Sequence, residues 1–317
     1  MEQRQAGGSG LWVSCTALGT MTWGNDTDQA EASDLLTAFV DAGGTLVDTA
    51  DVYNGGEGER ILGRLLNGVV RRSDVIIATK TGHATDGHRP VDTSRRHLLA
   101  SLDASLRRLQ TDHVDLWQLH AHDPATPFEE TLSALDAAVA SGKARYVGVG
   151  NMTAWQFAAL AAWQRSGGSG RNPVVTAAAE YSLLCRDPER DLLPAAAALG
   201  AGVIAWASLG RGVLSGKYRR GVPQGSRGSR PQMAPYVEPY LGEPSRRVVE
   251  SVCTAAEGLG VSPLAVALSW VRDRPGVASV AIGPRTAAQL DEILGAEDVR
   301  LPDEIREALD DASAKRR

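Results

Sequence analysis

Eight short apolar segments alternate with amphipathic segments along this chain, and this alternation limits the folds open to it more than any other feature. A short apolar run between turn residues is typical of a buried strand, and an apolar stripe at helical spacing is typical of a helix. Strands that alternate with helices pack as a parallel sheet, and eight such units close naturally into a barrel. The sequence therefore predicts an α/β fold of the (β/α)8 TIM-barrel type. Its strands are expected at residues 16–20, 45–50, 74–80, 114–120, 144–150, 174–181, 202–208 and 277–282.

Helices are expected between these strands and after the last one. Gly43-Gly44 and Gly142 would end two of them, because glycine is common just after a helix C-terminus. The helix at 93–109 carries its leucines on one face, which marks the side that packs on the barrel. The expected helices are 29–42, 58–69, 93–109, 127–141, 153–165, 189–199, 245–259, 263–272, 287–294 and 303–313.

Three segments stand outside these strand–helix units. Residues 3–14 hold the turn sequence Gly-Gly-Ser-Gly and are expected to form an N-terminal β-hairpin. A second Gly-Gly-Ser-Gly run at 167–170 is expected to be a flexible link. Residues 216–244, after the seventh strand, form a long irregular stretch rich in Gly, Pro, Arg and Ser. Such a loop in a compact domain is commonly a lid or a binding loop.

The chain has 317 residues, a length that suits either two domains or one eight-fold barrel. No change in composition divides it, so a single domain over residues 1–317 is expected. The alternative fold is an open doubly wound sheet, which requires a glycine-rich phosphate-binding turn after its first strand. Residues 19–24 read Gly-Thr-Met-Thr-Trp-Gly and lack that spacing, which favours the barrel.

Charge and cysteine content argue against several classes of partner. The formal net charge is -5 and basic residues occur only in short clusters, so neither nucleic acid nor a membrane surface is expected as the main partner. Three widely spaced cysteines show no disulfide framework and no zinc pattern, and no metal site is expected. The chain has no apolar signal core and no apolar span long enough to cross a bilayer, so a cytoplasmic location is expected. The oligomeric state is left open.

Four polar side chains follow three successive strands at their C-terminal ends, where such barrels carry their chemistry. The second strand delivers Asp48 and then Tyr53, the third ends at Lys80, and the fourth ends at His120. Taken singly, each has an ordinary structural explanation, such as a loop carboxylate, a packed phenol ring or a buried imidazole. Together they place a carboxylate, a phenol, an ammonium and an imidazole at one rim, which indicates a catalytic site.

This combination suits proton transfer to a carbonyl oxygen. A free tyrosine has a pKa of about 10 and is a slow proton donor at neutral pH. A lysine ammonium within hydrogen-bond reach is expected to lower the pKa of Tyr53, and Asp48 is the natural partner for a buried Lys80. His120 can orient or polarise the carbonyl group. None of these groups donates electrons, so a reduction requires a cofactor.

The sequence resembles the aldo-keto reductase superfamily, in its bacterial form, across essentially the whole chain. The resemblance implies an eight-fold barrel that binds NADPH in an extended pose and passes hydride from the nicotinamide to an aldehyde or ketone. It implies a catalytic tetrad of Asp48, Tyr53, Lys80 and His120, with Tyr53 as the general acid. The motifs that carry it are Leu18-Gly19-Thr20-Met21, Asp48-Thr49-Ala50-Asp51-Val52-Tyr53, Ala78-Thr79-Lys80, Gln118-Leu119-His120, Val149-Gly150-Asn151, Glu180-Tyr181-Ser182, Ser208-Leu209-Gly210-Arg211-Gly212 and Leu214-Ser215-Gly216-Lys217-Tyr218.

The resemblance also assigns residues to the cofactor. Asn151 would hold the nicotinamide amide, and Trp206 would stack on the ring; the ordinary alternative for Trp206 is a core tryptophan. Arg285 offers a cation for the adenosine 2′-phosphate, which favours NADPH over NADH. The cofactor-binding residues that it implies are Gly19, Thr20, Met21, Asp48, Asn151, Trp206, Ser208, Leu209, Gly210, Arg211, Lys217, Gly283, Arg285, Gln289 and Glu292.

This chain departs from the family pattern at four places, one of which is the end of the eighth strand, where the frequent Ile-Pro-Gly reads Ala281-Ile282-Gly283-Pro284. The family usually has a serine where this chain has Gly150, and a glutamine where it has Ala178. Both usually hydrogen-bond the carboxamide, so the nicotinamide is expected to be held less firmly here. An asparagine that contacts the adenine is replaced by Ile293. The tetrad is intact, and catalysis is expected to survive.

Three functions stay open. The first is NADPH-dependent reduction of an aldehyde or ketone, with a small-molecule carbonyl compound as partner. The second is reduction of an enone or a keto-sugar nucleotide in a biosynthetic pathway. The third is a non-catalytic NADPH-sensing subunit, like the channel-associated members of the family. Substrate choice is expected to depend on the 216–244 loop. His83 and His88, in the loop after the third strand, either line the substrate mouth or are solvated. Further side chains with an open role are Trp23, Trp117, His122 and Tyr236.

Overall fold

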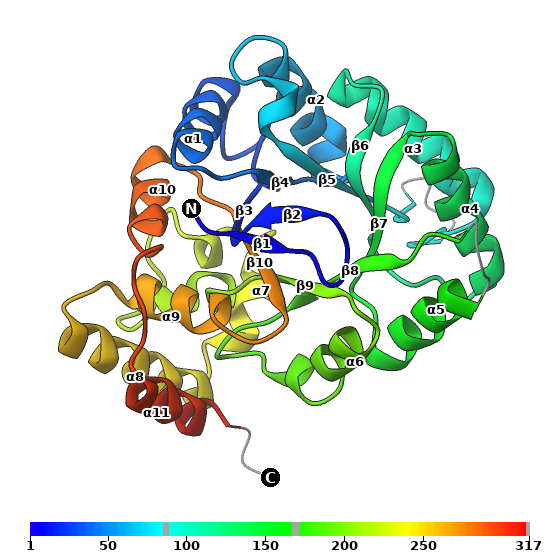
Figure 1. Ribbon diagram of the computed structural model, residues 1–317. Helices are drawn as coiled ribbons and strands as arrows, with labels where there is room; N and C mark the ends of the chain where they lie inside the picture. The colour runs from blue at the N-terminus through cyan, green and yellow to red at the C-terminus, as the bar shows by residue number, and fades with distance from the viewer. Residues whose placement is uncertain (85–88, 167–170, 315–317) are drawn as a thin grey trace.

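The computed structural model describes residues 1–84, 89–166 and 171–314, and its centre is a closed barrel of parallel strands (Figure 1). Neighbouring strands follow the chain order around the barrel, and the last strand pairs with the first to close it. Parallel neighbours need a long crossover, and the intervening helices supply it. This confirms the predicted (β/α)8 barrel. Its strands are β3 (Thr16–Gly19), β4 (Leu46–Asp48), β5 (Ile76–Thr81), β6 (Val114–Leu119), β7 (Ala144–Gly150), β8 (Val174–Glu180), β9 (Gly202–Trp206) and β10 (Val277–Ile282).

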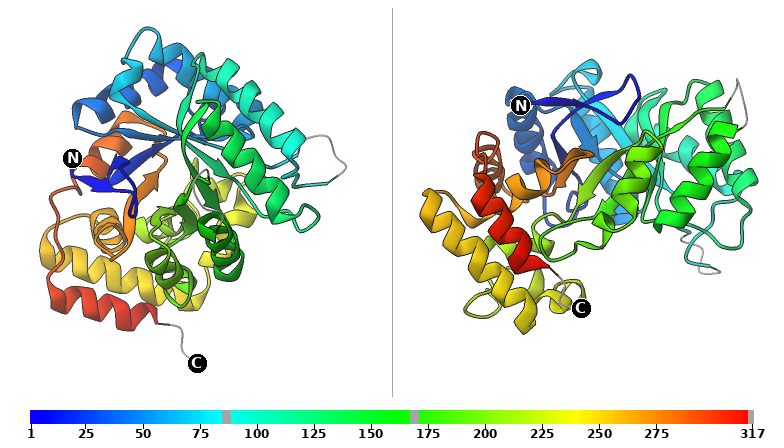
Figure 2. Two further views of the ribbon diagram at one scale, coloured as in Figure 1. Left: turned by 45° about the vertical axis from the view of Figure 1, so that its right-hand side comes forward. Right: turned by 60° about the horizontal axis from the view of Figure 1, so that its bottom comes forward.

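Helices surround the barrel, as Figures 1 and 2 show. Side-chain caps begin several of them: Asp28, Ser94, Ser262 and Thr286 each accept a hydrogen bond from the backbone N–H three residues further on. Most helices match their predicted ranges to within a few residues. The helices are α1 (Gln29–Asp41), α2 (Glu57–Leu66), α3 (Arg95–Leu109), α4 (Phe128–Ala140), α5 (Ala154–Ser166), α6 (Leu192–Ala198), α7 (Ala234–Val237), α8 (Glu243–Leu259), α9 (Pro263–Arg272), α10 (Ala287–Leu294) and α11 (Asp303–Ser313).

Among the described residues, no single helix is both long and apolar enough to span a membrane. α8 and α9 reach that length and composition only when taken together, and their axes are bent by 102°. The residues of α9 after its first position are all buried within the fold.

Two buried apolar clusters lie on the two sides of the barrel wall. One joins Leu46 and Ile204 of the strands to Leu11 of the N-terminal segment. The other joins Val47, and apolar side chains of the other strands, to apolar side chains of the helices. Consecutive residues Leu46 and Val47 belong to different clusters because side chains alternate between the faces of a strand. Strands buried on both faces explain the continuous apolar runs of the sequence.

The predicted N-terminal hairpin is present as β1 (Gln3–Gln5) and β2 (Trp12–Ser14), and it crosses the barrel opening in Figure 1. Gly8 donates its backbone N–H to the Gly200 carbonyl at 2.9 Å, just before β9 begins. Gly7 has φ +60°, and a Cβ there would overlap the backbone around Gly200. The hairpin therefore covers the end of the barrel where the strands start. The C-terminal ends of the strands lie at the opposite end.

One predicted helix is wrong in its extent. The range 189–199 is divided into η3 (Asp187–Glu189) and the shorter helix α6. Pro194 has no backbone N–H to donate, so it is tolerated in the first turn of a helix and not in its interior. Because α6 begins at Leu192, Pro194 falls within that first turn.

The stretch 216–244, predicted to be irregular, contains short helices of its own. These are η5 (Arg227–Ser229), α7 and η6 (Glu238–Tyr240). Tyr240 donates its hydroxyl to Glu180 at the end of β8 at 2.9 Å, so this segment is tied to the barrel rim. The run at 167–170, predicted to be flexible, lies outside the described residues.

Candidate active site

Lys80 lies at the centre of the predicted catalytic group. Its ammonium donates a 2.6 Å hydrogen bond to Asp48 Oδ2 and a 3.0 Å bond to the Thr49 carbonyl, and it lies 3.5 Å from the Tyr53 hydroxyl. Lys80 and Asp48 are buried, whereas Tyr53 is half-buried. The Lys80 ammonium thus contacts two of the other three predicted side chains, at the C-terminal ends of β4 and β5.

The loop from β4 to Tyr53 is held by hydrogen bonds on both sides. Asp51 donates its backbone N–H to the Lys80 carbonyl at 3.0 Å. Asn54, with φ +50°, donates its side-chain amide to two carbonyl oxygens of the β3–α1 loop at 3.0 and 2.8 Å. Tyr53 begins the short helix η1 (Tyr53–Gly56) between these two anchors. These contacts hold the backbone on both sides of Tyr53.

Burial and ion pairing act in opposite directions on this group. Burial acts to lower the pKa of Lys80, but the Asp48 carboxylate and the Tyr53 hydroxyl outweigh it and raise that pKa. Lys80 is therefore an ammonium. Burial raises the pKa of Tyr53, and the Lys80 charge only partly opposes this. Lys80 acts on the pKa of Tyr53 in the predicted direction, but burial outweighs it, and the net pKa lies above its usual value. Tyr53 is a protonated phenol, ready to donate.

His120, the fourth predicted catalytic residue, follows β6 and lies edge-on to Tyr53, with ring centroids 5.9 Å apart. Burial, the Lys80 ammonium and the His83 imidazole lower the pKa of His120 to about 3. The ring is therefore neutral and carries one N–H to donate. His83 packs edge-on against it at 4.6 Å, so the structure places His83 at the catalytic mouth. His88 lies outside the described residues.

Asn151 and Trp206, predicted to hold the nicotinamide, are hydrogen-bonded to each other. Trp206 Nε1 donates to Asn151 Oδ1 at 3.0 Å, and Asn151 Nδ2 donates to the His120 carbonyl at 2.9 Å. Asn151 has φ +55°, a backbone state that costs free energy outside glycine and occurs often at functional sites. The amide thus links the end of β9 to the strand end that carries His120.

The two small residues that depart from the family pattern face each other. A Cβ built on Gly150 would lie 3.7 Å from the Cβ of Ala178 and 3.2 Å from the Leu119 carbonyl. A serine at position 150 would therefore be tightly packed against β6. The side of the site near Asn151 is lined here by small apolar groups.

The residues predicted to wrap the pyrophosphate follow β9. Ser208 is buried, and its hydroxyl oxygen has no hydrogen-bond partner among the described residues. Gly210 and Gly212, in the short helix η4 (Gly210–Ser215), have φ +54° and +95°. Arg211 differs from the expectation of a phosphate ligand, because it forms a two-point ion pair with Glu180 at 3.0 and 2.7 Å. Ser208 and the backbone of this turn, rather than Arg211, are open to a phosphate.

Three cations gather beside this turn, and one of them was not predicted. They are Lys217, Arg285 and Arg227, of which Arg227 begins η5. Within the described part of the chain, none of the three forms an ion pair with a carboxylate. Loss of solvent and the guanidinium of Arg285 both lower the pKa of Lys217 and of Arg227. Glu292 and Asp26 act on Lys217 and Arg227 only at longer range, so three mutually repelling cations, bonded to no carboxylate of the described residues, fit a phosphate dianion. The sequence signal that could have found Arg227 is an arginine in a Gly/Ser-rich binding loop.

The other predicted cofactor residues lie around the same rim. Gly19 pairs with Asp48 across β3 and β4, and a Cβ there would lie 2.9 Å from the Ile282 carbonyl, so only glycine fits. Gln289 accepts the backbone N–H of Arg285 at 2.9 Å. Thr20 is buried and Met21 is exposed, directly after β3. The remaining positions follow β9, follow β10 or lie on α10: Leu209, Gly283 and Glu292.

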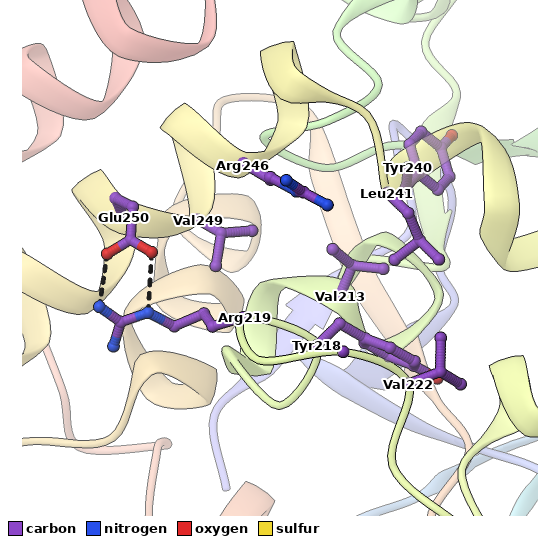
Figure 3. Close-up of a pocket in the computed structure, with 10 residues that line it drawn as sticks. Val213, Tyr218, Arg219, Val222, Tyr240, Leu241, Arg246, Val249 and Glu250 are labelled. Atoms are coloured by element: carbon purple, nitrogen blue, oxygen red, sulfur yellow. Dashed lines mark hydrogen bonds and ion pairs between the residues drawn. The ribbon is translucent and has the colours of Figure 1, made fainter.

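A cavity of about 130 Å³ lies between the segment after η4 and α8 (Figure 3). Apolar side chains such as Val213 and Val249 line it, and an Arg219–Glu250 ion pair closes one side at 2.8 and 2.5 Å. Tyr218, also in its wall, accepts the backbone N–H of Gly228 at 3.0 Å, next to Arg227. The cavity thus adjoins the cation cluster but holds no residue of the predicted tetrad.

Comparison with known proteins agrees with this geometry. Residues 17–314 match the aldo/keto reductase family. The chain is 36% identical to the oxidoreductase YrpG of Bacillus subtilis (strain 168), over 98% of this chain and 95% of the relative. It is 34% and 33% identical to probable voltage-gated potassium channel beta subunits of Oryza sativa subsp. japonica and Arabidopsis thaliana, over 94% of this chain and 92% of each relative. The chain therefore belongs to the aldo/keto reductase family of oxidoreductases.

Proposed function

We propose that this protein reduces an aldehyde or ketone to the corresponding alcohol with NADPH. The observation that carries the proposal is the group around Lys80, in which a buried ammonium touches both a carboxylate and a phenol. A buried lysine needs a counter-charge to remain ionised, and Asp48 supplies it. Such a group has a clear chemical use at a barrel mouth, which is to move a proton at Tyr53.

Tyr53 donates its hydroxyl proton to the oxygen of the substrate carbonyl. As the proton leaves, negative charge develops on the phenol oxygen, and the ammonium of Lys80 stabilises it. Asp48 keeps that ammonium charged and oriented throughout. Lys80 therefore acts mainly on the transition state, since burial keeps the pKa of Tyr53 raised in the resting protein.

His120 orients the substrate in this proposal and does not transfer the proton. Its pKa of about 3 means that it carries no positive charge at neutral pH and has a single N–H to donate. A neutral imidazole donates a hydrogen bond to a carbonyl oxygen without protonating it. The edge-on approach of the Tyr53 and His120 rings supports a shared role, in which both would donate to the same carbonyl oxygen.

NADPH, when bound, supplies the hydride that these side chains lack. The unpartnered hydroxyl of Ser208 and the turn at Gly210 would hold the pyrophosphate. Lys217, Arg227 and Arg285 would hold the 2′-phosphate, because three cations in one place need an anion to offset their repulsion. NADH lacks this phosphate, so the cluster supports a preference for NADPH.

The test is the steady-state consumption of NADPH by the purified protein with a panel of aliphatic and aromatic aldehydes and ketones, and with matched enones. The proposal expects turnover of carbonyl compounds and the alcohol as product. Turnover of enones alone would support the biosynthetic alternative. Tight NADPH binding with no turnover of any compound would overturn the reductase.

A sensing role is the second candidate, because two relatives are named as probable potassium channel beta subunits. In that case NADPH would bind with the affinity that the cation cluster provides, and the tetrad would have no substrate. The two candidates differ in turnover alone, so the carbonyl panel separates them.

A further inference from the structure

Behind the catalytic group lies a second set of charged side chains that the proposed proton transfer does not use. Glu59, on α2, is fully buried. Its two carboxylate oxygens accept hydrogen bonds from Thr79 Oγ1 and from Arg108 Nε, each at 2.6 Å. Asp51, two residues before Tyr53, lies within electrostatic range of Glu59 and of both nearby cations.

The charges of this region do not balance when every group is ionised. Three carboxyl groups, those of Asp48, Asp51 and Glu59, share two cations. Lys80 is bonded to Asp48 and Arg108 to Glu59, so both cations are already paired. Asp51 Oδ1 is buried and has no hydrogen-bond partner in the described part of the chain. Among the described residues, Asp51 has only a backbone hydrogen bond at Val52 and no cation bonded to it, whereas Asp48 and Glu59 are each bonded to one. A buried carboxylate oxygen without a partner costs free energy, so Asp51 is the group that gains most from holding a proton.

The titration of Asp51 agrees with this charge count. Burial raises the pKa of Asp51 to about 7, Glu59 adds to the effect, and Arg108 and Lys80 offset it only in part. Asp51 therefore changes charge near neutral pH, whereas His120, with a pKa of about 3, stays neutral there.

We propose that Asp51 is a positioning residue for the proposed reduction, and that the proton on its carboxyl group sets how readily Tyr53 gives up its own. This rests on the proposed function of Tyr53 as the acid. An ionised Asp51 raises the pKa of Tyr53. The phenol is then a weaker acid for carbonyl reduction, and its phenolate is a stronger base for alcohol oxidation. A protonated Asp51 removes that charge and favours reduction.

The consequence is that pH changes which reaction is favoured: carbonyl reduction at lower pH and alcohol oxidation at higher pH. The charged and titratable groups that face Tyr53 and Asp51 are Asp48, Glu59, Lys80 and Arg108, together with His120, against which His83 packs. The first four form the ion pairs Asp48–Lys80 and Glu59–Arg108. His83 contacts His120, so a variant at His83 is needed as a control for Asp51.

The kinetic test compares kcat for reduction, at saturating NADPH and substrate, in the wild type and in Asp51→Asn. We expect the wild-type rate to fall about three- to tenfold from about pH 6 to about pH 8.5, and the Asp51→Asn rate by less than about twofold. Asp51→Ser removes the same charge with a smaller side chain, in case the amide does not pack. Asp34→Asn, at an exposed carboxylate of α1, is the matched control and should follow the wild type.

Alcohol oxidation gives the complementary result, because Asp51→Asn should lose rate at about pH 8.5, where the wild type gains it. His83→Gln should keep the wild-type inflection. An inflection that disappears in His83→Gln and persists in Asp51→Asn would overturn the proposal. So would identical profiles in the wild type and both Asp51 variants.

A second measurement does not depend on turnover. The infrared C=O stretch of a protonated carboxyl group should appear in the wild-type difference spectrum between about pH 6 and about pH 8.5, and should be missing in Asp51→Asn. Failure to reduce any carbonyl compound would overturn the proposed function while this band still reported on Asp51. Absence of the band in the wild type would overturn the inference about Asp51 itself.

Discussion

At Lys80 and Asp48, two buried charges stabilise the site only while both are present. The pair lies at 2.6 Å with both side chains nearly out of solvent. Removing one partner of such a pair leaves the other charge buried without compensation, which costs more than the pair contributes. Stability and the proposed proton transfer would therefore depend on the same contact, and mutagenesis can separate them.

Lys80→Met should destabilise the protein by about 3–5 kcal/mol, because Asp48 is left as a buried, unpaired carboxylate. The double variant Asp48→Asn with Lys80→Met should recover part of that stability and none of the activity. Urea unfolding and NADPH consumption measure the two effects. Equal stability of the single and double variants would contradict the ion-pair account.

Arg285→Ala and Arg227→Ala should each weaken NADPH binding by about 10- to 100-fold, since a charge-assisted hydrogen bond to phosphate is worth about 1.5–3 kcal/mol. Binding of NADH should change by less than about twofold, because it lacks the 2′-phosphate. Arg246→Ala, an exposed arginine beside the cavity of Figure 3, is the control and should affect neither cofactor. Equal losses for both cofactors would argue against a 2′-phosphate contact. Fluorescence titration measures each affinity.

Among the elements, the N-terminal hairpin and the 216–244 segment lie at opposite ends of the barrel and have different roles. The hairpin packs on the strand starts through Gly7 and Gly8. The segment reaches the rim through Tyr240 and carries Arg227. A change in the hairpin should therefore affect stability and leave the chemistry of the rim in place.

Gly7→Ala should lower the free energy of unfolding by roughly 1–3 kcal/mol, because its Cβ meets the Gly200 backbone and its φ is +60°. Gly8→Ala is the matched control, since a Cβ there meets the Gly200 carbonyl at an ordinary 3.7 Å. Chemical denaturation measures both variants. If the two variants unfold alike, the hairpin does not dock as described.

For the whole molecule, the charge of Asp51 makes stability depend on pH. Its folded pKa, about 7, lies above its ordinary value of 3.8, so the folded state holds the proton more tightly than the unfolded chain does. The stability gained from that proton is present at low pH and is lost as pH rises from about 4 to about 7.

Asp51→Asn should therefore gain stability over the wild type as pH rises, by about 1–2 kcal/mol between about pH 5 and about pH 8 after allowance for the partial exposure of the side chain. Asp34→Asn should not. Thermal unfolding across this range measures the difference. A constant difference between the wild type and Asp51→Asn would show that Asp51 does not titrate there.

The barrel could be predicted from the sequence because the spacing of apolar residues and the length of each segment distinguish strands from helices. The short apolar runs around Val47 and Ile77 are examples. The tetrad followed from the same pattern, because strand ends in a parallel barrel meet at one rim. The start of α6 was missed because Pro194 outweighs the apolar pattern around it. Arg227 was missed because its role depends on where a folded loop places it. The pairing of Arg211 with Glu180 and the raised pKa of Tyr53 arise from burial, which local sequence does not report.

Rapid mixing of the NADPH-bound protein with an aldehyde that the wild type reduces, in the wild type and in Tyr53→Phe, tests the proposed role of Tyr53. We expect the rate of NADPH oxidation to fall by at least about 100-fold in the variant, because the proton donor is lost. NADPH affinity should stay within about twofold, because the proposed contacts to the cofactor phosphates come from other side chains. Reduction by Tyr53→Phe at the wild-type rate would show that Tyr53 is not the acid.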